Sequence, residues 1–313
     1  MRKTVAIIIV VTNEESHLPV LLKSITNQSY KNIQVYILDN NCVDNSMEII
    51  HALYPAAKII HSQINTGFAK GNNILADAAI KEGADYIFVL NPDIELHIDC
   101  ISRLVNLMER HRDISIAAPI MFFGLEKRNE NVIQSYIKNI DFKKRKIEKT
   151  NSGKVFVDGM YPEEVEVNIV PGGITFIESE VINQIGLFEE MYFMYGDESD
   201  LALRAYKKGY KMMITSAAKV WHHHDFSKKN RNGCYFKYYY ITRARYLYFR
   251  KYKFYKSLLT NLIKEIITSP FKVKWAIKIC DIRLLNYYYK GIWDGLMNKK
   301  GESKLIKNIS NSE

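Results

Sequence analysis

The stretch "VAIIIVVTNEE", residues 5–15, decides the fold. Its first seven residues form a continuous and largely β-branched apolar run, which is typical of a strand buried on both faces of a parallel sheet. The run is short for a secretory signal, and charged Glu14 and Glu15 follow it in place of a small-residue cleavage site. We therefore predict that the chain opens with a central buried strand.

The segments that follow alternate between strand and helix. Further strands are expected at 33–39, 56–62, 84–91 and 115–119, the last closed by Pro119. Helical apolar spacing occurs between them, at 17–28, 44–53, 68–83 and 100–111. Alternation of this kind predicts an α/β fold in which a mostly parallel sheet is flanked by helices.

Polar residues stand just past the ends of four predicted strands. They are Thr12–Glu14, Asp39–Asn41, Asn65–Gly67 and Asn91–Asp93. Ligands of open α/β sheets bind at the carboxyl ends of the strands, so these residues are candidate binding groups.

Two of these strand ends carry an aspartate and one carries a glycine-containing loop. Asp93, assisted by Asn91, suits a divalent cation such as Mg²⁺ or Mn²⁺, although an Asn-Pro-Asp turn, common at strand ends, is the simpler explanation of the motif alone. Asp39 suits ribose hydroxyls or a base edge, or a capping loop. The segment "NTGFAKGNN", residues 65–73, supplies a helix start and Lys70, which favour phosphate.

Residues 120–170 break the alternation and predict an irregular insertion with hairpin character, which includes the basic stretch "FKKRKIEK" at 142–149. Regular structure returns with a strand running into a helix at 172–186. A helix from about 198 to 208 and a strand at 211–217 follow. The segment "WHHHDFS", residues 221–227, offers one imidazole to join Asp93 on a metal, or simply a surface histidine cluster.

Three carboxylates crowd the stretch "FMYGDESDLALR", residues 193–204. Asp200 and Arg204 are four positions apart on a predicted helix and are expected to pair. Helix capping does not account for Asp197 and Glu198 beside aromatic residues. A carboxylate near apolar rings and a like charge has a raised pKa, which suits a general base.

The charge of the chain, +10 overall, is unevenly placed. Residues 228–313 hold 20 Lys/Arg against 5 Asp/Glu, whereas residues 1–227 hold 24 against 29. The same C-terminal region interleaves 17 aromatic residues with its cations. This predicts either contact with an anionic cytoplasmic membrane face or a helical subdomain that packs its aromatic side chains on the body. No nucleic-acid-binding motif accompanies the charge.

Taken together, the motifs resemble those of family 2 glycosyltransferases with the GT-A fold, in particular the bacterial rhamnosyltransferase-like branch. The resemblance covers residues 4 to about 250 in order, through "IIIVVTNEE", "ILDNNCVDNS", "NTGFAKGNN", "LNPDIEL" and the long segment from Gly172 to Met212. It implies a catalytic domain at 1–227 with a helical, basic and aromatic extension at 228–313.

The resemblance also implies a role for each candidate residue. Asn91-Pro92-Asp93 stands where the family has its Asp-x-Asp metal motif, so Asp93 would hold the cation, and His222 matches a later ligand. Glu198 would be the base, because the second position of the family's acidic pair normally has that role. Asp197 is the second choice, since the usual Glu-Asp order is reversed here. Donor contacts would come from Thr12, Asn13, Glu14, Asp39, Asn65, Gly67, Lys70 and Asn91.

The activity implied is that of a metal-dependent inverting glycosyltransferase of the hexosyltransferase class. It would move a sugar from a nucleotide-diphosphate donor to a glycan or a polyprenyl-diphosphate-linked acceptor in cell-surface polysaccharide synthesis. dTDP-rhamnose is favoured only by the branch, and UDP-galactose and UDP-glucose stay open. The expected location is cytoplasmic, on the inner face of the cell membrane. The alternative is a non-catalytic nucleotide-sugar-binding or scaffold protein on the same fold.

Overall fold

The structure of this chain is a computed structural model that describes residues 2–124, 130–223, 231–278 and 281–305. The strands are β1 (Val5–Val11), β2 (Ile33–Asn40), β3 (Lys58–Ser62), β4 (Tyr86–Val89), β5 (Ile94–Leu96), β6 (Ile114–Phe123), β7 (Ile133–Ser135), β8 (Lys138–Asp141), β9 (Lys146–Lys149), β10 (Glu164–Val167), β11 (Phe176–Glu178) and β12 (Lys211–His222). The helices are α1 (Leu18–Thr26), α2 (Ser46–Leu53), α3 (Gly67–Lys81), α4 (Cys100–Arg110), α5 (Ser179–Ile185), α6 (Asp197–Lys207), α7 (Arg231–Lys251), α8 (Tyr255–Lys278) and α9 (Arg283–Leu296), with short 3₁₀ turns η2 (Gly172–Ile174) and η3 (Glu190–Tyr192).

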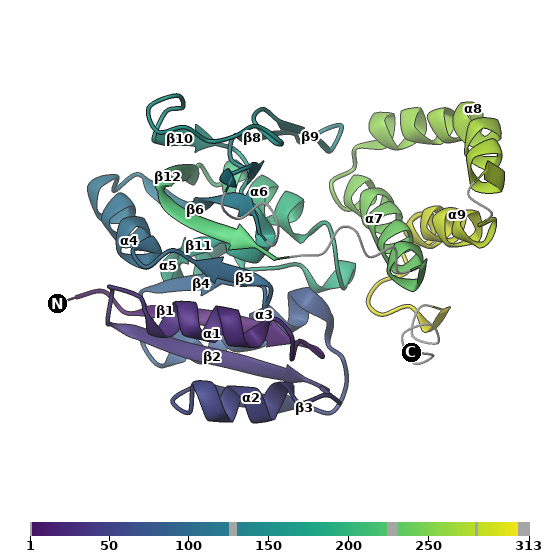
Figure 1. The fold of residues 1–313 in the computed structure, drawn as a ribbon. Helices are drawn as coiled ribbons and strands as arrows, with labels where there is room; N and C mark the ends of the chain where they lie inside the picture. Colours follow the sequence, from purple (N-terminus) through teal and green to yellow (C-terminus); the bar gives the residue numbers. More distant parts are fainter. Residues whose placement is uncertain (1, 125–129, 224–230, 279–280, 306–313) are drawn as a thin grey trace.

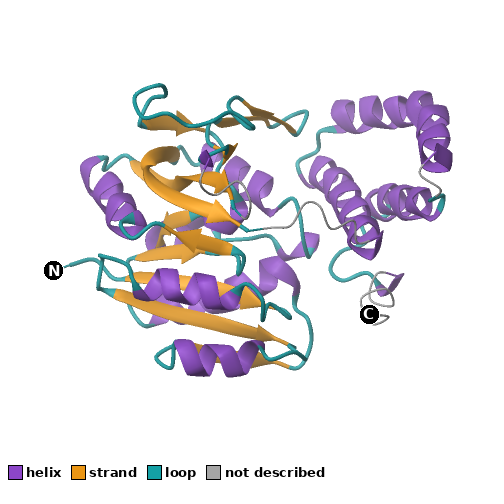
Figure 2. Ribbon diagram, viewed as in Figure 1, coloured by secondary structure: helices purple, strands orange, loops and turns teal. Residues whose placement is uncertain are grey.

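One mixed sheet forms the body of the molecule (Figures 1 and 2). Its strands run in the order β10-β12-β6-β11-β4-β1-β2-β3, with β5 paired to β12 and β7 to β6. The half that contains β4, β1, β2 and β3 is parallel, as predicted. β11 is antiparallel to both β4 and β6, which the strand–helix alternation did not predict.

The opening strand β1 is buried on both faces, which confirms the first prediction. Ala6 and Ile8 belong to one hydrophobic cluster, whereas Ile7 and Ile9 belong to another on the opposite face. Because side chains alternate along a strand, an uninterrupted run of apolar residues places side chains in the hydrophobic clusters on both faces of the sheet.

The predicted end of the fifth strand at Pro119 is wrong. β6 continues through Pro119 to Phe123, and β12 continues beyond Ala217 to His222. The register between these strands shifts between Thr215 and Lys219, so β12 bulges opposite the proline. A bulge tolerates a residue without an N–H donor inside a sheet, because the ladder hydrogen bond is already interrupted there.

The C-terminal helices lie to one side of the sheet (Figure 1). On α7 the rings of Tyr239, Tyr240, Tyr246, Tyr248 and Phe249 are buried, as the packing alternative predicts. The expected domain boundary between residues 227 and 228 falls in 224–230, outside the described residues. None of the described helices is both long enough and apolar enough to span a bilayer.

Candidate functional site

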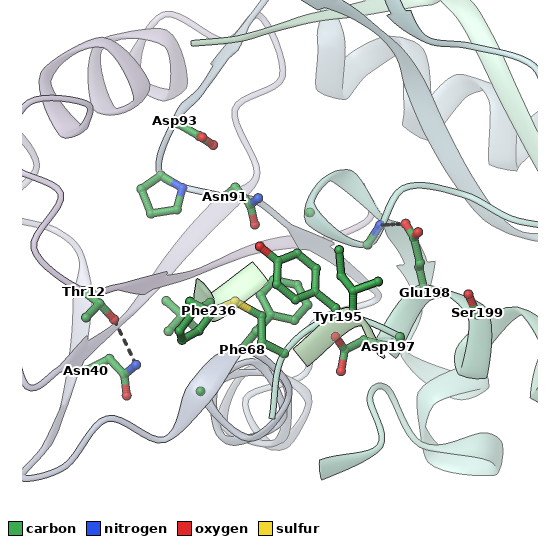
Figure 3. A pocket seen from close by; sticks show the side chains of 18 of the residues that line it. Thr12, Asn40, Phe68, Asn91, Asp93, Tyr195, Asp197, Glu198, Ser199 and Phe236 are labelled. Atoms are coloured by element: carbon green, nitrogen blue, oxygen red, sulfur yellow. Dashed lines mark hydrogen bonds between the residues drawn. The ribbon is translucent and has the colours of Figure 1, made fainter. Parts of the chain in front are cut away.

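A cavity of about 770 Å³ opens at the carboxyl ends of β1, β2 and β4 (Figure 3). The start of α6 and the turn η2 form other parts of its wall. Eight of the predicted site residues line it: Thr12, Glu14, Asn65, Gly67, Asn91, Asp93, Asp197 and Glu198. Predicted residues up to 186 positions apart in the chain, from Thr12 to Glu198, therefore converge on one site.

The wall near β1 and β2 is organised by Asn40, which the sequence indicated only as one of the polar residues 39–41. Its Nδ2 donates to Thr12 Oγ1 and to Asn65 Oδ1, both at 3.0 Å. Its Oδ1 accepts the Thr66 N–H at 2.7 Å. One amide side chain thus ties three strand-end loops together, and it reaches the cavity because it ends a strand whose alternate side chains point to opposite faces.

The neighbouring Asp39 does not line this cavity. Its carboxylate accepts the Cys42 N–H at 2.9 Å and contacts His61 Nδ1 at 2.9 Å. Asn13 and Lys70 also lie outside the cavity wall: Asn13 Oδ1 accepts the Val43 N–H, and Lys70 is exposed on α3. Gly67 does line it, with φ +76°, and a Cβ there would lie 2.6 Å from the Phe193 ring.

The predicted metal residues come together at the edge of the same cavity. Asp93 Oδ2 lies 2.9 Å from His222 Nε2, although 129 positions separate the two residues. Pairing of β5 with the end of β12 brings them together, since His222 is in register with Ile94. The other ring nitrogen of His222 hydrogen-bonds the Gln134 side chain, which fixes the orientation of the imidazole. His223 contacts Glu95 at 2.8 Å, while His224 and Ser227 lie outside the described residues.

The two acidic candidates at the start of α6 occupy different environments. The Glu198 side chain is 29% exposed, and its Oε2 lies 3.3 Å from the Gly172 N–H, which donates to it, and 3.5 Å from Lys138 Nζ. Asp197 is only 4% exposed, and among the described residues its Oδ1 has no hydrogen-bond partner. Burial raises the pKa of Asp197 to about 7, and the charges of Glu198 and Asp200 add to that effect. Figure 3 shows the two carboxylates pointing away from each other.

Asp200 anchors the helix that carries these acids. The predicted pair is confirmed, because Arg204 Nε lies 2.7 Å from Asp200 Oδ2. The fully buried carboxylate also accepts from Lys251 Nζ at 2.6 Å and the Tyr252 hydroxyl at 2.7 Å. Burial raises the pKa of Asp200, but Arg204 and Lys251 outweigh that effect and hold it below its ordinary value. The end of α7 is thereby fixed to the start of α6.

Two further walls were not predicted. Arg145 and Ile147 reach the cavity from the insertion, and Phe236, Ile241 and Arg245 reach it from α7. The basic and aromatic composition of both segments was visible in the sequence, but their contact with the strand ends depends on the tertiary structure.

Comparison with known families identifies the family to which the chain belongs. The model of "Glycosyl transferase family 2" matches residues 6–165, and that of "Glycosyl transferase family group 2" matches residues 86–297. The chain belongs to glycosyl transferase family 2. It is therefore an inverting glycosyltransferase, as the resemblance of its motifs implied.

Curated relatives place this family 2 glycosyltransferase near rhamnosyltransferases. It is 21% identical to the N-acetylglucosaminyl-diphospho-decaprenol L-rhamnosyltransferase of Mycobacterium tuberculosis (strain ATCC 25618 / H37Rv) over 239 residues, which are 71% of this chain and 77% of the relative. It is 27% identical to the rhamnosyltransferase WbbL of Escherichia coli (strain K12) over 192 residues, 58% of this chain and 72% of the relative. These similarities confirm the rhamnosyltransferase-like branch.

Solved structures of low identity share the fold. GalNAc-T7 with UDP, GalNAc and Mn²⁺ has a TM-score of 0.59 at 15% identity, over 77% of this glycosyltransferase and 47% of that chain. TarS 1–349 of S. aureus has a TM-score of 0.55 at 11% identity, over 98% and 83%. The glycosyltransferase thus spans about half of the GalNAc-T7 chain. The expected GT-A fold is confirmed.

Proposed function

We propose that this glycosyltransferase moves a sugar, with rhamnose the first candidate, from a nucleotide-diphosphate donor to a hydroxyl of a glycan or a polyprenyl-diphosphate-linked saccharide. The observation that carries the proposal is the convergence of Glu198, Asp93 and the strand-end polar residues on one cavity, with His222 in contact with Asp93. The named activity of the mycobacterial relative supports a lipid-diphosphate-linked acceptor. Synthesis of a cell-surface polysaccharide is the role that suits these substrates.

In the proposed reaction Glu198 acts as the general base. The acceptor hydroxyl oxygen attacks the anomeric carbon and Glu198 takes its proton, while the bond from that carbon to the diphosphate oxygen breaks. The nucleoside diphosphate leaves with the bonding electrons, and the configuration is inverted. The Gly172 N–H donates to Glu198 Oε2 and Lys138 Nζ lies 3.5 Å from the same oxygen, and these contacts orient the carboxylate that would take the proton.

A divalent cation suits the Asp93 and His222 side chains. Carboxylate oxygen and imidazole nitrogen are ligands that Mn²⁺ accepts, and Mg²⁺ commonly binds one or two carboxylates together with substrate phosphates. Among the described residues no group of three or more His, Cys, Asp or Glu side chains forms a closed metal site. We therefore assign Asp93 and His222 as the protein ligands of a cation completed by the donor diphosphate. When bound, such a cation supplies positive charge to the departing phosphates.

Turnover with a panel of sugar nucleotides tests both the transfer and the cation. We expect transfer from one donor, dTDP-rhamnose first, with Mn²⁺ or Mg²⁺ present, and loss of at least about 10²-fold after chelation. Asp93→Ala should abolish the cation-dependent part of donor binding, whereas Asp77→Ala on the exposed face of α3 should not. Donor binding without any turnover would instead favour the non-catalytic nucleotide-sugar-binding protein.

We also propose that α8 rests on an anionic membrane surface. Its solvent-facing side carries the apolar residues Tyr255, Leu259, Ile263, Ile266, Pro270, Val273 and Ile277, each three or four positions from the next. Ile266 and nearby Phe271 are 74% and 72% exposed. Five lysines lie on α8, whose single acid, Glu265, is buried and paired with Lys272. An apolar face flanked by cations matches the surface of an anionic bilayer.

Sedimentation with phosphatidylglycerol vesicles tests this contact. We expect the wild type to sediment with the vesicles and Ile266→Ser combined with Phe271→Ser to lose most of that binding. The control pair is Val43→Ser with Ile64→Ser, which removes two exposed apolar residues from the loops that follow β2 and β3. Equal sedimentation of both variants would refute the contact.

A further inference from the structure

A second cavity, of about 910 Å³, lies beside the first and shares two arginines with it. It is enclosed by the turn between β8 and β9, by the α7–α8 connection and by the first turns of α8. Figure 1 shows the β8–β9 hairpin facing that connection. We call this cavity the basic groove. Arg145 and Arg245 line both cavities, so the basic groove adjoins the site that holds Glu198 at these two side chains.

All charged residues that line the basic groove are lysine or arginine. They include Lys143, Arg145, Arg245, Lys253, Lys256 and Lys264. Lys144 and Lys146 also line it, but each pairs with an acid on its own hairpin, Asp141 at 3.3 Å and Glu148 at 3.1 Å. Neither of those acids lines the groove. So many cations around one concave surface repel one another unless an anion occupies it.

The two shared arginines point to what that anion is. Among the described residues Arg145 Nε is buried without a hydrogen-bond partner. Burial lowers the pKa of Arg145, and the charge of Arg245 acts in the same direction. A phosphate between the two guanidinium groups would supply the missing acceptor and offset both effects, because guanidinium matches phosphate oxygens in geometry as well as charge.

We propose that the basic groove binds the diphosphate of the acceptor; this inference rests on the proposed function. The sugar hydroxyl would then lie in the first cavity at Glu198, and the diphosphate would lie at Arg145, Arg245 and the groove lysines. Tyr255 lines the groove and is also the first residue of the apolar face of α8. The prenyl chain would leave the groove at Tyr255 toward the membrane surface.

Binding of farnesyl diphosphate tests the assignment without requiring the donor to be known. The titration uses the full chain in Mg²⁺ with excess UDP, so that the nucleotide site is occupied and does not compete for the probe. Lys256→Gln with Lys264→Gln removes two groove charges from α8. Lys274→Gln with Lys278→Gln removes two exposed charges from the same helix outside the groove. We expect about tenfold weaker binding for the first pair and less than a twofold change for the second.

Two results would overturn the assignment. One is an equal effect of both lysine pairs, or of neither, on farnesyl diphosphate affinity. The other concerns the Lys256→Gln, Lys264→Gln variant. If it keeps its affinity for farnesyl diphosphate but selectively loses binding to phosphatidylglycerol vesicles, the groove binds lipid headgroups instead. Absence of turnover in the donor panel would reject the proposed function while this binding result still stood, so the two failures are distinguishable.

Discussion

Replacing Glu198 by Gln is expected to lower sugar transfer by about 10³-fold while the donor affinity changes by less than about twofold. A positioned general base typically contributes 10²–10⁴ to the rate, and glutamine cannot accept the proton. The glutamine Oε1 can still accept the Gly172 N–H, so the start of α6 should keep its structure. The measurement is kcat under saturating donor and acceptor, together with donor affinity from titration.

Asp197→Asn is the matched control for that experiment, because it removes the adjacent carboxylate from the same helix turn. If Glu198 is the base, Asp197→Asn should retain most of the transfer activity at pH 8. Loss of activity in Asp197→Asn with near-normal activity in Glu198→Gln would reverse the assignment and make Asp197 the base.

Asp197→Asn should also change how stability depends on pH. Burial raises the pKa of Asp197 to about 7, above its ordinary value of 3.8. Between these two values the unfolded chain releases a proton that the folded chain retains, so folding loses stability as the pH rises from about 4 to 7. The variant lacks this loss. Its unfolding free energy relative to the wild type should therefore grow by about 3 kcal/mol between pH 5 and pH 8.

Denaturant unfolding of the variant and the wild type at pH 5 and pH 8 measures this change. The pH-independent effect of placing an amide at the site is the same at both pH values and cancels from the comparison. The matched control is Asp77→Asn, which alters an exposed carboxylate on α3. A relative stability of Asp197→Asn that stays flat across the pH range would contradict the raised pKa. The same result in Asp77→Asn as in Asp197→Asn would show that the effect is not local to the buried site.

The insertion and the C-terminal helices both bring positive charge to the region of Glu198. Lys138, Arg145 and Arg245 place positive charge near Glu198, from segments outside the first half of the sheet. These cations attract an anionic acceptor to the region of the proposed base. The insertion and the helical extension therefore contribute to the site itself, although the sequence suggested only an irregular excursion and a basic tail.

The sequence alone predicted the parallel half of the sheet and the strand-end position of the site, because both depend on short-range periodicity and on the rule that parallel strands end at one edge. It also singled out Asp93, Asp197, Glu198 and His222 as candidates, through local motifs and their resemblance to a family. The pair of Asp200 and Arg204 was equally readable, because four positions on a helix fix their proximity.

Only the tertiary structure decided which of two adjacent strand-end residues faces the cavity, Asn40 rather than Asp39. It also decided that β6 passes through Pro119 and that β11 enters the sheet antiparallel. Arg145 and Arg245 come together because a hairpin and a helix a hundred positions apart pack against each other. Such contacts depend on packing between segments that are distant in the sequence, and local residue patterns do not report that packing.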